Sequence, residues 1–149
     1  MASTRGGDKL NAKLKEIAEK VKKARSVKVG FLKGATYPDG KPVALVAAIQ
    51  NYGAPAKGIP PRPFFTNMVR EDGPSWPEQV GKILKANDYD SERTLNQMGE
   101  VISGELRESI IATNSPPLSP KTARRKGSTK PLVDTGHMLN SIDHEIETE

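Results

Sequence analysis

PVALVAAIQNYGAPAKGIPPRPFF, residues 42–65, is a short apolar helical pattern that runs directly into a proline-rich loop. Pro42 suits the first turn of a helix and Gly53 suits the position just past its end, so we expect a helix between them. Each proline of residues 55–63 fixes its own φ angle and pushes the preceding residue toward extended geometry. The pattern therefore predicts a rigid loop that places Arg62 and the phenylalanine pair after it at a fixed point.

We interpret the end of this loop as a docking segment for another protein chain. Arg62 would pair or hydrogen bond with the partner, and Phe64 or Phe65 would anchor in an apolar pocket. The residues of the predicted docking segment are Ile59, Pro60, Pro61, Arg62, Pro63, Phe64 and Phe65.

The chain has 149 residues, which is long enough for one domain with a sizeable core, and residues 1–149 are interpreted as a single domain. It has no cysteine, which excludes thiol catalysis, zinc–thiolate sites and disulfides. Its net charge of +5 favours weak contact with polyanions and does not by itself identify a nucleic-acid reader. The longest apolar run, residues 43–49, is too short to cross a bilayer, and residues 1–8 do not resemble a signal peptide. We expect a chain made in a cytoplasm, with no membrane partner.

Two amphipathic helices are predicted on either side of this stretch. Apolar residues recur at helical spacing over residues 8–24, where the opposite face is rich in lysine, and we expect Asp8 to cap this helix and residues 1–7 to form a flexible arm. Asp90 or Ser91 would cap the longest helix, residues 92–112. The predicted core stripe of that helix consists of Leu95, Met98, Ile102, Leu106 and Ile110.

Period-two alternation predicts strands over residues 26–32 and 142–146. Shorter helical patterns cover residues 64–70, 76–86 and the region of Met138 and Leu139. The predicted fold class is therefore α+β, with a small, mostly antiparallel sheet packed by a long helix, an N-terminal amphipathic helix and two long proline-rich loops.

The second proline-rich loop, residues 113–131, is the most basic part of the chain. Its basic side chains are Lys121, Arg124, Arg125, Lys126 and Lys130. Three interpretations stay open: a solvated loop, contact with DNA phosphates, or contact with the acidic C-terminal segment of a neighbouring copy in a head-to-tail oligomer.

Three motifs resemble catalytic or ligand sites and fail in detail. Residues 132–136, LVDTG, resemble a retroviral aspartic protease, but the preceding chain reads helical and only thirteen residues follow; Asp134 or Thr135 better suits capping of the next helix. Residues 34–41 have one residue too many for a phosphate-binding loop. His137 and His144 lack companion ligands for a metal. We therefore expect no enzyme, no metal and no cofactor.

Taken together, several segments resemble one family. These are Val29-Gly30-Phe31, Tyr37-Pro38-Asp39-Gly40, the helix over residues 43–49, Tyr52-Gly53-Ala54, Ile59-Pro60-Pro61-Arg62-Pro63-Phe64, and Leu132-Val133-Asp134-Thr135-Gly136 with Leu139, Ser141 and Ile142. In this order they are similar to the tail-completion and neck proteins of tailed bacteriophages, the group that includes minor tail protein Z-like chains. The similarity covers residues 26–70 and 90–146.

The resemblance implies a virion protein, made in the bacterial cytoplasm, without catalytic activity. Such a protein assembles as a homo-oligomeric ring at the head-to-tail junction, with a hexamer as the first expectation and a dodecamer as the alternative. Its neighbours would be connector, tail terminator or tail tube proteins, and its channel would contact genomic DNA non-specifically. The alternative hypothesis is a small DNA-binding protein that uses the lysine-rich first helix and the basic residues of 121–130.

Overall fold

The computed structural model describes residues 6–113, 120–126 and 136–148. The predicted cap residues Asp134 and Thr135, the basic residue Lys130 and the side chain of Lys126 lie outside this description. The described helices are α1 (Gly7–Val21), α2 (Val43–Tyr52), α3 (Phe64–Asp72), α4 (Trp76–Ala86), α5 (Ser91–Ala112), α6 (Pro120–Lys126) and α7 (His137–Asn140). Two short 3₁₀ turns, Pro55–Lys57 and Gly73–Ser75, and two strands complete the order.

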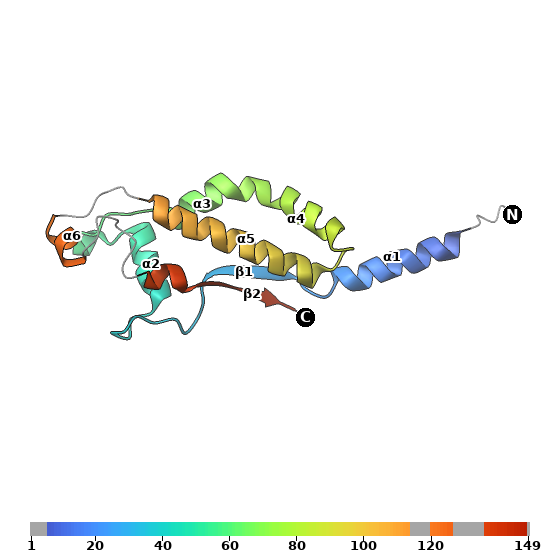
Figure 1. Ribbon diagram of the computed structural model, residues 1–149, viewed down its shortest axis with the longest axis horizontal. Coiled ribbons are helices and arrows are strands. Elements are labelled where there is room, and N and C mark those ends of the chain that lie inside the picture. Colours follow the sequence, from blue (N-terminus) through green and yellow to red (C-terminus); the bar gives the residue numbers. More distant parts are fainter. Residues whose placement is uncertain (1–5, 114–119, 127–135, 149) are drawn as a thin grey trace.

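The long helix α5 lies between two layers of the molecule (Figure 1). On one side it packs against α3 and α4, and on the other against a two-stranded sheet. The strands β1 (Ser26–Phe31) and β2 (Ile142–Glu147) are antiparallel, with Phe31 opposite Ile142. This arrangement confirms the predicted α+β class and the packing of a long helix on a small antiparallel sheet.

α5 begins at Ser91, one residue before the predicted start, with Asp90 as its cap. The Asp90 carboxylate accepts a hydrogen bond from the backbone N–H of Arg93 at 3.1 Å, which satisfies one of the free donors of the first turn. This hydrogen bond holds the pKa of Asp90 below its usual value. The cap prediction is confirmed.

The core forms around the apolar stripe of α5. Four of the five predicted stripe residues are buried there, whereas Leu95 is only partly buried. The rest of the core comes from α2, α3, α7 and β2. The buried residues of the whole core are Val43, Ala47, Phe64, Met68, Met98, Ile102, Leu106, Ile110, Met138 and Ile142. Gly99 lets β2 approach α5 closely, because a Cβ at that position would lie 2.6 Å from Cγ of His144.

The first helix extends away from this body (Figure 1). It starts one residue earlier than predicted, after Gly6, and Asp8 lies in its first turn instead of capping it. None of its residues is buried, and Leu10 and Leu14 are 60% and 54% exposed. The amphipathic pattern therefore predicts the helix correctly, but its apolar face has no partner within the described part of the subunit.

Only the end of α1 is tied to the body. The hydroxyl of Ser91 donates to the carbonyl of Lys20 and accepts from the N–H of Ala24, both at 3.0 Å. Lys23 lies 3.3 Å from the carboxylate of Asp90. These contacts fix the direction in which α1 leaves α5.

Candidate docking surface

The helix α2 has an apolar face on both sides. Val43 and Ala47 point into the core, whereas Leu45 and Tyr52 are 55% and 74% exposed. Ala48 is exposed on the same outer face, since positions 45, 48 and 52 recur at helical spacing. The ten residues of α2 include no charged side chain. Exposed apolar side chains gathered on an uncharged helix face are typical of a contact surface.

The proline-rich loop is fastened to the end of α2. The N–H of Arg62 donates to the carbonyl of Gln50 at 2.7 Å, and its guanidinium donates to the Gln50 side chain at 3.2 Å. Ala54 and Ile59 exchange two backbone hydrogen bonds of 2.9 and 3.1 Å across the turn. Gly53 has a φ of 77°, and a Cβ there would lie 2.8 Å from the backbone nitrogen of Pro61. The loop is thus held to α2 by hydrogen bonds, but its first half is a 3₁₀ turn over Pro55–Lys57 and is not extended as predicted.

The roles predicted for Arg62 and Phe64 are wrong. Arg62 is 5% exposed, and burial lowers the pKa of its guanidinium. Phe64 is 1% exposed, and its ring meets that of Phe31 edge to face with centroids 6.3 Å apart. Phe65 is partly buried against the core. Arg62 and Phe64 therefore serve the interior of the subunit, whereas the alternative anchor Phe65 keeps part of its surface exposed.

The helical spacing of Phe64 and Met68 in the sequence indicates that Phe64 is buried. It opens α3, and Met68 follows four residues later on the same inner face. Both residues are buried, so the spacing of a short amphipathic helix outweighs the position of Phe64 at the end of a loop.

Sequence reasoning missed Asn51, which joins the two sides of the loop. Its side-chain oxygen accepts hydrogen bonds from the N–H groups of Phe65 and Thr66 at 3.0 and 3.2 Å, and its amide donates to the Thr66 hydroxyl at 2.9 Å. Pro63, at the N-cap position of α3, provides no side-chain cap. A side chain of α2 thus accepts hydrogen bonds from the free backbone N–H groups in the first turn of α3. The one hint of this contact in the sequence is a polar residue near the end of an apolar helix.

What stays exposed in the predicted docking segment is its proline edge. Pro60 and Pro61 are exposed, and Ile59 and Pro63 are partly so. This edge lies beside the end of α2, because Pro61 approaches Gly53 closely. We define the α2 surface as Leu45, Ala48, Tyr52, Pro60 and Pro61.

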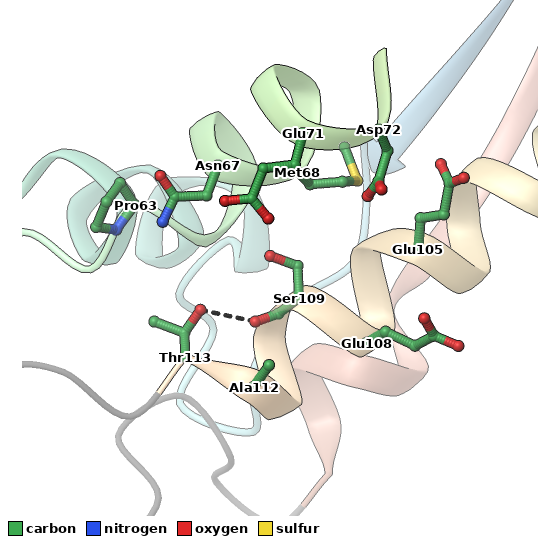
Figure 2. Close-up of a pocket in the computed structure, with 10 residues that line it drawn as sticks. All are labelled: Pro63, Asn67, Met68, Glu71, Asp72, Glu105, Glu108, Ser109, Ala112 and Thr113. Carbon is green, nitrogen blue, oxygen red and sulfur yellow. Dashed lines mark hydrogen bonds between the residues drawn. The ribbon is translucent and has the colours of Figure 1, made fainter. Parts of the chain in front are cut away.

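A hollow of about 430 Å³ lies between α3 and α5 (Figure 2). Its lining residues are Pro63, Asn67, Met68, Glu71, Asp72, Glu105, Glu108, Ser109, Ala112 and Thr113. Four of these ten are acidic and none is basic. Burial raises the pKa of Glu105, although the indole N–H of Trp76 donates to its carboxylate at 2.8 Å. We call this hollow the acidic groove.

The basic and histidine residues singled out from sequence lie elsewhere. Lys121, Arg124 and Arg125 are exposed on α6. His137 lies 2.7 Å from the carbonyl of Thr36, and His144 lies 3.3 Å from the side-chain oxygen of Asn96. Within residues 6–113, 120–126 and 136–148, no group of three or more His, Cys, Asp or Glu side chains could hold a metal ion.

No helix among the described residues is long and apolar enough to span a membrane. The chain matches no family model, no curated protein and no solved structure.

Proposed function

We propose that this chain is a structural virion protein that assembles as a ring at the head-to-tail junction of a tailed bacteriophage. There it joins the connector to the tail tube around the DNA channel. The observation that supports this proposal best is the α2 surface, an uncharged helix face with an adjoining proline edge, both exposed in the described part of the chain. The family resemblance supplies the biological setting, since its segment of residues 59–64 forms this edge.

The α2 surface is suited to repeated contacts. Its shape is fixed before binding by the hydrogen bonds of Arg62 and Asn51, so little ordering entropy opposes association. Full burial of a leucine-sized side chain stabilises by about 1.5–3 kcal/mol, and Leu45 and Tyr52 are already partly buried. One such contact contributes only a few kcal/mol, so we expect rings to form because each subunit makes two of them or binds a neighbouring neck protein as well.

The experiment that tests this function compares purified protein with purified particles. Light scattering and negative-stain imaging should detect rings, alone or with a neck partner, and mass spectrometry should detect the chain in virions. A strictly monomeric chain that is absent from particles would contradict the proposal.

The exposure of α1 favours a second candidate, the small DNA-binding protein. Its lysines lie on a helix with no buried residue, and Lys9 and Lys15 form no ion pair within the described part of the chain. Lysines placed this way neutralise phosphates, and the affinity then falls steeply with salt. A titration against duplex DNA at several salt concentrations tests this candidate. Affinity at physiological salt with a steep negative slope supports it, and no binding eliminates it.

A further inference from the structure

An apolar stripe on α1 has no partner among the residues that the structure describes. Leu10, Leu14 and Val21 are 60%, 54% and 42% exposed. A helix of this length, 15 residues, is marginal in water when nothing packs on it. In Figure 1 α1 points away from the body. Its N-terminal half could pack against α3 only if the helix bent or broke. No surface within residues 6–113, 120–126 and 136–148 covers this stripe, so we look for its partner in another molecule.

The charges beside the stripe indicate what that surface is like. At 100° per residue, Lys9 and Lys13 flank the stripe on one side. The side chain of Lys13 is 52% exposed and reaches Glu16 only at 3.5 Å. Lysine stems are apolar and their ends are charged, so a matching surface has an apolar floor and acidic edges.

The acidic groove has this composition. Pro63 and Ala112 supply accessible apolar lining, and the carboxylates come from both α3 and α5 (Figure 2). Asp72 and Glu108 both act to raise the pKa of Glu105, which means that these carboxylates repel one another. A cation placed in the groove would relieve that repulsion.

Apolar surface for the stripe lies next to the groove. Val101 is 36% exposed and precedes Glu105 by one turn of α5, on the same helix face. The groove and α1 belong to different parts of the subunit, so a contact between them joins one copy to the next. Such a contact is heterologous, and it closes into a ring when the rotation between copies allows.

We propose that α1 is an interaction surface for a second copy of this chain, with its stripe and the flanking Lys9 and Lys13 seated along the acidic groove of that copy. This inference rests on the self-association that the proposed function requires. It adds a second contact between subunits, separate from the α2 surface, and it identifies the groove as the receptor.

The test is zero-length cross-linking of a mixture of unlabelled and ¹⁵N-labelled protein. A carbodiimide joins a carboxylate to an adjacent lysine amine as an amide with loss of water, so ion pairs become covalent links. We expect mixed-label links from Lys9 or Lys13 to Glu108 or Asp72, in excess over mixed-label links to the exposed Glu78 on α4. Absence of that excess would overturn the inference, and so would mixed-label links from the groove to Lys121 in place of α1.

Charge-reversal variants provide a second test, in which self-association is measured. Lys13→Glu and Glu108→Lys should each weaken self-association, by about two- to fivefold for each surface ion pair lost. The two substitutions together should restore it. Lys82→Glu on α4 changes the net charge by the same amount as Lys13→Glu and should have no such effect, because Lys82 lies outside both surfaces. Equal weakening by all three variants would overturn the inference.

The outcomes separate this inference from the proposed function. If the links form in the groove but virions lack the chain, the proposed function fails and the inference holds. If rings occur in virions and no such links form, the inference alone fails. A chain that stays monomeric at every concentration and beside its neck partners contradicts both.

Discussion

The interior position of Phe64 makes a quantitative prediction about the Phe64→Ala variant. The side chain is 1% exposed and packs in the core formed by α2, α3 and α5. Truncation of a buried phenylalanine to alanine costs about 3–5 kcal/mol, from lost burial and from the cavity left behind. The edge-to-face pair with Phe31 is lost at the same time, although its contribution is already part of that range. Against a total stability of about 5–15 kcal/mol, this loss is large.

Urea denaturation followed by circular dichroism measures this change. We expect the free energy of unfolding to fall by about 3–5 kcal/mol, and the midpoint of thermal unfolding to fall by roughly 6–20 °C for a chain of this size. Tyr52→Ala, measured at a concentration at which both chains are monomeric, is the matched control, because it also removes an aromatic ring but from a side chain that is 74% exposed. That control should change stability by less than about 0.5 kcal/mol. Equal effects of the two variants, or a loss below about 1 kcal/mol for Phe64→Ala, would refute the assignment of Phe64 to the interior.

Three further predictions concern single contacts. Asn51→Ala should lower stability by about 1–3 kcal/mol in urea denaturation, because two backbone N–H groups at the start of α3 lose their acceptor; an unchanged midpoint would contradict this. Gly99→Ala should lower the thermal midpoint although alanine favours helices, because its Cβ would clash with the His144 ring. A higher midpoint would show that β2 moves freely. At pH values above the raised pKa of Glu105, the Glu105→Gln variant should be more stable than the natural chain, because the ionised carboxylate is costly there. This gain in stability should disappear below pH 4.5, the usual pKa of a glutamate. A gain that persists at low pH would contradict this prediction.

Local periodicity in the sequence predicts most of the fold. The alternation of residues 26–32 and the long stripe of residues 92–112 correspond to β1 and α5, and the Asp90 cap starts α5 as expected. These features depend on neighbours a few residues apart, which a single sequence displays directly. The helix predicted over residues 8–24 forms over Gly7–Val21, but periodicity does not reveal whether a second surface covers its apolar face.

The candidate site was harder to predict, because it depends on contacts between elements. Proline geometry predicts a rigid loop and does not tell which way Arg62 and Phe64 point once the loop is closed. That direction is set by Gln50 and Asn51, which hold the loop and the start of α3 from the neighbouring helix. The acidic groove likewise combines residues of α3 and α5 that are distant in sequence.

The measurement that tests the central claim most directly is the assembly state of variants of the α2 surface. Leu45→Ser and Tyr52→Ser replace side chains that are 55% and 74% exposed, and Val69→Ser, at 42% exposure on α3, is the matched control. Light scattering with negative-stain imaging would be applied to each variant after circular dichroism shows a folded subunit. We predict that the two α2 variants stay folded and lose rings, while the control assembles like the natural chain. Unchanged rings in the α2 variants, or equal loss in the control, would contradict the claim that α2 is the docking surface.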